Sequence, residues 1–171
     1  MAASETPPVL IADDTNVLLD LAEEVEDVTD AMLAIRRRLP QSELLMLPTV
    51  REELAAEALD AEDFQEKARA RIAFGLARTW RIQPIDLVGR RFETARRVSR
   101  RLRHAGLLPE EEINDGLIIA EAAELECSML ITSDEHLRGI DFQCLTFELQ
   151  AFALAAPVVA TPREIARKFF R

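Results

Sequence analysis

The stretch that decides the fold is Val9-Leu10-Ile11-Ala12-Asp13-Asp14. Its four consecutive apolar residues lack the alternation of a half-exposed strand. They therefore indicate a strand that is buried on both faces, as is typical of parallel sheets. The run ends at once in two carboxylates. The sequence thus predicts a central strand with acids at its carboxyl end.

Strand-like and helical segments alternate along the rest of the chain. Four further strands are predicted from apolar or extended runs at residues 44–47, 81–88, 129–131 and 158–160. Helical spacing lies between them, over residues 17–38, 62–79, 89–104 and 112–126, and helices are also expected to begin at Thr49 and Thr161. Residues 135–156 are left unassigned. The pattern predicts an α/β fold, a three-layer sandwich with a central parallel sheet of about five strands.

Finer expectations follow from local patterns. Thr49-x-x-Glu52 has the spacing of a capping box, and the helical segment over residues 17–38 is expected to be interrupted near Asp27. The inward faces of two helices are predicted from their apolar positions, which are Phe64, Ala68, Ile72 and Leu76 in the first, and Phe92, Ala95, Val98 and Leu102 in the second.

Length and composition narrow the class of protein. The 171 residues are enough for one sizeable core, so a single domain over residues 1–171 is predicted. Residues 1–8 are polar and precede only a strand-length apolar run, so we expect no secretory signal or membrane span and a soluble, cytoplasmic protein. Cys127 and Cys144 have no CxxC or Cys/His pattern, which indicates two reduced thiols in or near the core.

Charge is distributed unevenly along the chain. The net charge of −10 argues against a nucleic-acid partner, because phosphate binding requires a basic surface. However, residues 67–104 carry 12 bases and 2 acids, while residues 1–66 carry 17 acids and 4 bases. Residues 105–171 are again acidic. We therefore expect one positive face, suited to an anionic partner, on an otherwise acidic molecule.

Four acids are placed where an open parallel sheet binds ligands, beyond the carboxyl ends of its strands. Asp14 and Asp134 follow strands, Glu53 lies early in the helix after the second strand, and Asp115 begins the helix that leads to the fourth. Converging carboxylates repel one another, and hard divalent cations such as magnesium take oxygen ligands. The sequence therefore predicts a bound metal ion.

Each of these acids also has an ordinary structural interpretation. Asp14 and Asp115 are suitable helix caps, Asp134 is a suitable turn residue, and Glu53 is a suitable exposed helix acid. Glu53 and Asp115 share their helix faces with apolar residues, which would direct them toward the sheet. Taken together, the four acids favour the functional interpretation.

Four runs resemble the motifs of PIN-domain ribonucleases, in their order as well as in their residues. They are VLIADDTNV at residues 9–17, PTVREEL at 48–54, NDGLIIAEA at 114–122 and LITSD at 130–134. The resemblance continues through Thr-Pro-Arg-Glu at residues 161–164. It implies a five-stranded parallel sheet, Mg²⁺ or Mn²⁺ in an acidic pocket, and endonuclease cutting of RNA, as in VapC-type toxins.

The resemblance also assigns roles to individual residues. Matched position by position, the catalytic and metal-binding acids are Asp14, Glu53, Asp115 and Asp134, and the supporting polar residues are Asn16 and Thr132. Doubled acids leave two alternatives open, Asp13 in place of Asp14 and Glu52 in place of Glu53. We prefer Asp14 because residues 14–17 keep the family spacing, and Glu53 because the capping box would occupy Glu52.

Expectations for partners follow from the basic helix and from the family. Guanidinium groups match phosphate geometry, so RNA is expected to contact Arg90, Arg91, Arg97, Arg100 and Arg101, and also Arg96, Arg103 and His104. A solvated helix face and a docking face for an acidic or amphipathic protein are the alternatives. The expected partners are RNA, an antitoxin or other inhibitory protein, and a second copy of the chain.

The sequence thus predicts a metal-dependent endoribonuclease that hydrolyses RNA phosphodiester bonds, the toxin of a toxin–antitoxin pair. The alternative is a catalytically silent PIN-fold module for binding or assembly. A response-regulator receiver would also begin with acids after its first strand. A receiver would also need a phosphorylatable Asp at the end of its third strand and a lysine late in the domain. No Asp lies between Asp30 and Asp60, and no lysine lies between Lys67 and Lys168, so the later residues do not fit a receiver.

Overall fold

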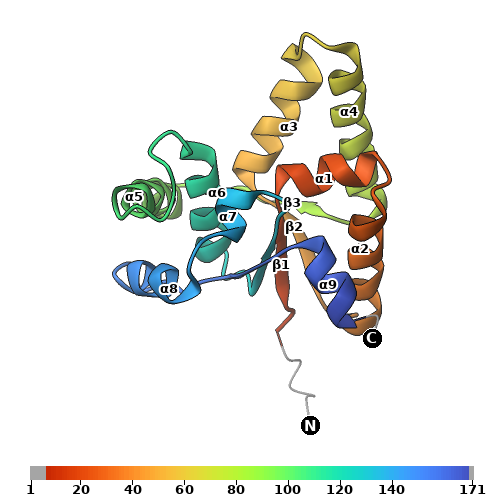
Figure 1. Cartoon of the computed structure of the whole chain (residues 1–171). Helices are drawn as coiled ribbons and strands as arrows, with labels where there is room; N and C mark the ends of the chain where they lie inside the picture. The colour runs from red at the N-terminus through yellow and green to blue at the C-terminus, as the bar shows by residue number, and fades with distance from the viewer. Residues whose placement is uncertain (1–6, 170–171) are drawn as a thin grey trace.

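The centre of the protein is a parallel sheet of five strands, seen in a computed structural model that describes residues 7–169 (Figure 1). Its strand order is β3-β2-β1-β4-β5, and all neighbouring strands are parallel. The strands are β1 (Leu10–Asp13), β2 (Glu43–Met46), β3 (Gln83–Pro84), β4 (Met129–Ile131) and β5 (Val158–Ala160). The predicted fold class is confirmed. The expectation for residues 1–8 falls mostly outside the described residues.

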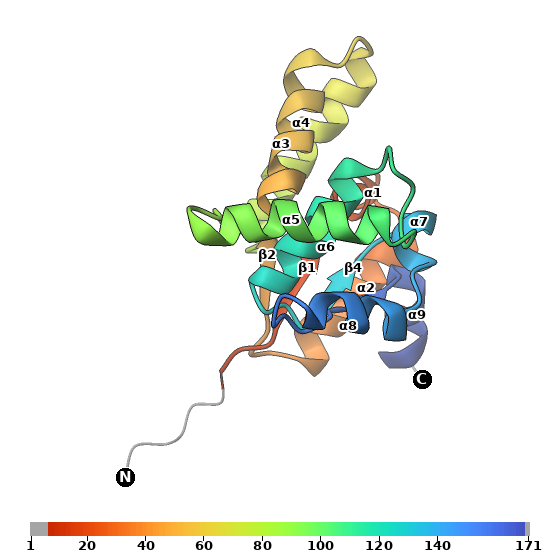
Figure 2. The same cartoon turned by 90° about the vertical axis from the view of Figure 1, so that its left-hand side faces the viewer.

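Helices cover both faces of the sheet (Figure 1). One face carries α2 (Glu26–Arg38) and α9 (Pro162–Phe169), and the other carries α5 (Arg90–His104), α6 (Ile113–Glu124) and α8 (Phe142–Gln150). Figure 2 shows α5 lying across α6, with α8 running below it. The short helices α1 (Thr15–Ala22) and α7 (Glu135–Arg138) begin just after β1 and β4.

Two helices project from this body as an arm (Figure 1). They are α3 (Pro48–Asp60) and α4 (Phe64–Thr79), which pack against each other. The strands run toward the end of the molecule from which the arm projects (Figure 1). The first turns of α3 therefore stand beside the carboxyl ends of the strands.

The strand β1 lies at the centre of the sheet, between β2 and β4. Ile11 and Ala12 have no exposed surface, as expected for a strand buried on both faces. From β1 the chain extends the sheet to one side through β2 and β3, and then returns to the other side of β1 to form β4 and β5. Such a switch in direction opens a crevice at the carboxyl ends of β1 and β4, where ligands bind in open α/β sheets.

Several predicted elements differ in detail from those observed. The helical segment over residues 17–38 is broken at residues 23–25, just before Asp27, and Glu24 there has a φ of 56°. The third strand has only two residues. The unassigned residues 135–156 contain α7 and α8, which are too short to show a clear helical period. The helix predicted to end near Gly106 does so, and this glycine has a φ of 74°.

The predicted inward face of α4 is wrong for two of its four residues. Phe64 is 79% exposed and Ile72 is 51% exposed, whereas Leu76 packs against the core. The fully buried residues of α4 are Ala70, Ala73 and Ala77, whose small side chains let α4 approach α1 and α3 closely. Phe92 of α5 is also exposed, while Ala95, Val98 and Leu102 are buried as predicted.

The burial of the two cysteines and the lack of a membrane-spanning segment were also predicted from the sequence. Cys127 is buried, but Cys144 is exposed, so only one of the two thiols lies in the core. Over residues 7–169, the structure has no helix that combines the length and apolar character needed to cross a membrane.

Candidate functional site

Asp14 joins the carboxyl ends of β1 and β4. It is the residue after β1, its backbone N–H donates to the Ile131 carbonyl at 2.9 Å, and only 3% of its surface is exposed. One carboxylate oxygen accepts from the Thr15 N–H at 2.6 Å, which caps α1, and the other accepts from the Thr132 hydroxyl at 2.7 Å. Asp14 therefore has the ordinary capping role and also bonds to the residues that end β4 and follow it.

Asp134 is tied to Asp14 through Thr132. The Thr132 hydroxyl that donates to Asp14 also accepts from the Asp134 backbone N–H at 2.9 Å. The Asp134 Oδ1 atom caps α7 by accepting from the N–H groups of His136 and Leu137. Thr132, predicted as a supporting residue, thus makes direct contacts with two of the predicted acids.

Glu53 is held by residues of two other helices. Its Oε1 atom accepts from the Asn114 amide of α6 at 2.6 Å, and its Oε2 atom accepts from the Thr15 hydroxyl of α1. Asn16, the predicted supporting residue, is exposed, and its side chain takes part in no hydrogen bond found among residues 7–169. Its neighbour Thr15 makes the contact to the site instead.

Asp115 is the third residue of α6 and carries the least compensated charge of the four acids. Its Oδ2 atom is buried without a hydrogen-bond partner. Burial raises the pKa of Asp115 to about 7, and repulsion from nearby carboxylates adds to the effect; these belong to Asp134, Glu112, Asp14 and Glu53. The structure thus brings the four predicted acids within electrostatic reach of one another.

The pKa of Asp14 responds to the same neighbours. It is raised to about 6: burial is the main cause, the hydrogen bonds from Thr132 and Thr15 oppose it, and repulsion from Glu53 and Asp134 adds to it. No lysine or arginine is among the groups that shift the pKa of Asp14 or Asp115. We call Asp14, Glu53, Asp115 and Asp134 the rim acids, and none of them takes part in an ion pair within residues 7–169.

The rim acids fit a hard divalent cation in their donor chemistry and charge. All of them offer carboxylate oxygens, and the unpartnered Asp115 Oδ2 atom is a buried acceptor without a donor. Magnesium needs only a few carboxylates, because it keeps several water ligands. Within residues 7–169, however, no three Asp, Glu, His or Cys side chains already stand together as a complete ligand group.

Asp13, the alternative to Asp14, faces a different environment. It has no exposed surface, and both of its carboxylate oxygens lack a hydrogen-bond partner. Burial raises its pKa to about 7, with a further contribution from Asp14. Asp13 lies near Cys127. The pKa of Cys127 is raised to about 12, mainly by burial and in addition by the charge of Asp13. Asp14, and not Asp13, is thus the member of this pair that bonds to Thr132 beyond the end of β4.

The capping box predicted at Thr49 and Glu52 is wrong. Thr49 donates instead to Glu121 of α6, through its backbone N–H at 3.1 Å and its hydroxyl at 2.7 Å. Glu52 is exposed, and no side chain caps the first residue of α3 locally. Because α3 begins at Pro48 with Leu47 at the N-cap position, Thr49 lies inside the first turn, and its hydroxyl donates to the buried Glu121 carboxylate 72 positions away. Glu53 still reaches the rim, although the argument that excluded Glu52 fails.

Glu121 is one of the site residues that the sequence reasoning missed. It is 4% exposed, and burial raises its pKa to about 7 against the hydrogen bonds from Thr49, which lower it. An acid in the middle of an apolar, alanine-rich segment was a signal for it, because buried carboxylates need partners. Thr15 and Asn114 were also missed, although both lie next to predicted site residues.

Gly116 was missed as well, and it places Asp115. A Cβ atom at this position would lie 2.5 Å from the Ser99 Oγ atom and 3.2 Å from the Ser99 carbonyl oxygen. The Ser99 hydroxyl in turn donates to the Ile113 carbonyl. Only glycine therefore lets α5 cross the first turn of α6 so closely, directly beside Asp115.

The arginines of α5 are not equally available. Arg101 pairs with Glu148 of α8 at 2.5 Å, and the Arg97 guanidinium lies over the Phe152 ring at 5.7 Å. Arg103 pairs with Glu110. Arg90 and Arg100 are exposed and take part in no ion pair found among the described residues. The predicted RNA-binding set thus divides into engaged and unengaged side chains.

The parallel sheet and its acids at the switch point define an α/β protein with a carboxylate rim. The model of the PIN domain family matches residues 12–143, so the chain belongs to the PIN domain family. The predicted resemblance is confirmed. No match is found among curated proteins.

Solved structures with the same fold include two toxin–antitoxin complexes. One is VapBC2 from Rickettsia felis bound to a DNA fragment from its promoter, with a TM-score of 0.63 and 12% identity. The other is VapBC-5 from Mycobacterium tuberculosis, with a TM-score of 0.50 and 18% identity. Each match covers 90% of this chain and 98% of the solved chain. At these identities the likeness concerns the fold.

Proposed function

We propose that this protein is a metal-dependent endoribonuclease that hydrolyses RNA phosphodiester bonds with its rim acids. The observation that carries the proposal is the set of acids itself. Asp14, Asp115 and Asp134 together build up negative charge at the carboxyl ends of the strands, and the groups that shift the pKa of Asp14 and Asp115 include no basic residue. Membership of the PIN domain family supports the same activity.

The roles of the rim acids follow from their contacts. Asp14 is fixed by Thr132 and Thr15, so it would offer its remaining lone pairs in a defined direction. Glu53 is fixed by Asn114 and Thr15, while Asp115 has an oxygen atom with no other partner. Bound Mg²⁺ or Mn²⁺ would supply Lewis acidity and lower the pKa of a coordinated water. The acids would set the geometry of that site.

The RNA strand would be held mainly by the unengaged arginines of α5. Arg90 and Arg100 are free to pair with phosphates, whereas Arg97 and Arg101 would first have to leave α8 or its neighbouring loop. Arg91 is also exposed, although it lies close enough to Glu124 to lower the pKa of that acid. We propose Arg90, Arg91 and Arg100 as the principal RNA contacts.

We also propose that the protein is the toxin of a toxin–antitoxin pair. The support is its likeness in fold to two solved chains from complexes of this kind. An antitoxin would then be its protein partner.

One observation favours the second candidate, a PIN-fold binding module without catalysis. The described residues contain no complete group of three metal ligands. A labelled RNA incubated with the protein while Mn²⁺ is titrated separates the two functions. The nuclease is expected to produce discrete fragments that increase with Mn²⁺ and disappear with a chelator, whereas the module would bind RNA and leave it intact at every Mn²⁺ concentration.

A further inference from the structure

The amino end of α3 is capped by a residue of another helix. Leu47 at the N-cap position provides no side-chain hydrogen bond. The Glu121 carboxylate of α6 replaces it, with one oxygen on the Thr49 N–H and the other on the Thr49 hydroxyl. This carboxylate also stands at the positive end of the α3 dipole, which favours a negative charge.

The same two helices meet at a second point. Glu53 lies one turn after Thr49 on α3, and Asn114 lies seven residues, about two turns, before Glu121 on α6. The Asn114 amide donates to Glu53 at 2.6 Å, as Thr49 donates to Glu121. Two polar contacts therefore join α3 to α6. One is the hydrogen bond between Asn114 and Glu53 at the rim, and the other is the buried pair of Thr49 and Glu121.

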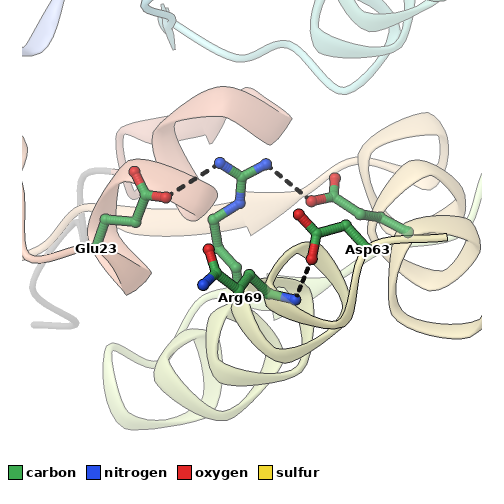
Figure 3. A network of polar contacts seen from close by, with 5 residues as sticks. Glu23, Asp63 and Arg69 are labelled. Atoms are coloured by element: carbon green, nitrogen blue, oxygen red, sulfur yellow. Dashed lines mark hydrogen bonds and ion pairs between the residues drawn. The ribbon is translucent and has the colours of Figure 1, made fainter. Parts of the chain in front are cut away.

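The rest of the arm is anchored by Arg69 of α4 (Figure 3). Its guanidinium group binds Glu57 of α3 at 2.9 Å and Glu23, at the end of α1, at 3.1 Å. These contacts tie the two helices of the arm to each other and to α1. The pair of Thr49 and Glu121 is then the buried contact that fixes where α3 starts, and hence the position of Glu53 relative to Asp14 and Asp115.

We propose that Glu121 is a positioning residue, which holds the start of α3 so that Glu53 completes the cation site of the rim. The inference rests on the proposed function. Glu121 itself would touch neither the cation nor RNA. It acts through Thr49 and the first turn of α3, in the way that outer groups orient metal ligands.

If Glu121 served only to stabilise the fold, a carboxylate would be an unfavourable side chain for that role. Burying an acid costs free energy unless its oxygens are hydrogen-bonded, and an apolar side chain would fill the same space at lower cost. The second buried acid of α6, Glu124, offers a comparison. The groups that lower its pKa, Arg91 and Thr94, both belong to α5 rather than to α3. Glu124 is therefore a matched control.

The test measures the affinity of the whole protein for Mn²⁺ alone, by electron paramagnetic resonance of the free ion. Thr49→Val removes the hydroxyl and keeps the shape, and we expect it to weaken Mn²⁺ binding by about 10-fold to 100-fold. Thr49→Ser keeps the hydroxyl and should bind like the wild type. Glu124→Gln should also bind like the wild type. Should Thr49→Val fail to fold, Glu121→Gln provides a milder change with a smaller expected loss.

The variants also separate positioning from simple stabilisation. In RNA cleavage, the loss should appear in kcat, with KM for RNA nearly unchanged, because the arginines of α5 are untouched. A Thr49→Val or Glu121→Gln protein that unfolds at a lower temperature yet binds Mn²⁺ as tightly as the wild type would overturn the inference. A wild-type protein that binds no Mn²⁺ would overturn the proposed function, and this inference with it.

Discussion

The rim acids and the arginines of α5 are both clusters of like charge, but their surroundings differ. The rim acids receive hydrogen bonds from threonine, asparagine and backbone N–H groups, and no basic residue offsets the charge of Asp14 or Asp115. In α5, Arg101 and Arg103 have their own carboxylates, and Arg97 has an aromatic ring. The rim acids thus lack the countercharges that the engaged arginines of α5 have, and the proposed divalent cation would supply them.

The largest effect is expected at the rim. Asp14→Asn and Asp115→Asn each keep the shape of the side chain and remove one negative charge. Because both residues would ligate the cation, cleavage of RNA should fall by about 100-fold or more, beyond the loss seen for outer residues of metal sites. Circular dichroism and RNA cleavage measured on the same samples check this. A folded Asp115→Asn protein with wild-type activity would remove Asp115 from the site.

The contact between the two regions gives the next prediction. Gly116→Ala would place a Cβ atom 2.5 Å from Ser99 Oγ, so α5 and α6 must separate. We expect a loss of about 1–3 kcal/mol in the free energy of unfolding, the usual cost of overpacking, and lower activity because Asp115 moves with α6. Urea unfolding measures the first effect.

A matched control is Gly75→Ala in α4, where an added Cβ meets nothing within 4 Å. Because alanine is the better helix former, this variant should be at least as stable as the wild type. Equal stability of Gly116→Ala and Gly75→Ala would show that α5 and α6 are not in close contact at this point.

Stability should depend on pH through the buried acids. The pKa of Asp13 and of Asp115 is about 7, and that of Asp14 is about 6, whereas all three lose their protons near pH 4 in the unfolded chain. The folded state thus binds more protons between about pH 4 and pH 7, so the free energy of unfolding should fall as the pH rises through this window.

Asp13→Asn tests this dependence without changing a rim acid. The variant removes one of the groups that hold a proton in the folded state. Its free energy of unfolding should therefore fall less between about pH 5 and pH 8 than that of the wild type. Urea unfolding at both pH values provides the comparison. Identical pH dependence of the two proteins would mean that Asp13 is not buried as a protonated acid.

The smallest effects are expected on α5. Arg100→Gln removes an unengaged arginine, so RNA should bind more weakly and with a salt dependence lower by about 0.7 in the log–log slope. Arg101→Gln removes an arginine already paired with Glu148, so its effect on RNA binding should be smaller. Fluorescence anisotropy at several salt concentrations distinguishes the two. If Arg101→Gln lost more RNA affinity than Arg100→Gln, Arg101 and not Arg100 would be the arginine that contacts RNA.

The sequence predicted what depends on local pattern and sheet topology. The apolar runs at β1 and β4 end in acids, and a parallel sheet must bring such ends together, so Asp14 and Asp134 could be placed without coordinates. The last helix begins after Thr161 as expected, and Thr161 and Glu164 form a capping box there.

The errors arose where a distant contact prevailed over the local pattern. Thr49 has the same spacing to Glu52 as Thr161 has to Glu164, yet it bonds to Glu121. The large apolar residues Phe64 and Ile72 face outward because α4 packs through its alanines. Which arginines of α5 are engaged depends on α8, a helix that the sequence pattern did not reveal.

Anomalous scattering from a crystal of the wild-type protein soaked in Mn²⁺ would show directly whether the rim acids hold a cation. We expect a peak at the carboxyl ends of β1 and β4, with oxygen atoms of Asp14 and Asp115 among its ligands and Glu53 and Asp134 beside it. A well-ordered rim without a peak at high Mn²⁺ concentration, or a peak elsewhere alone, would contradict the claim that these four acids hold a divalent cation.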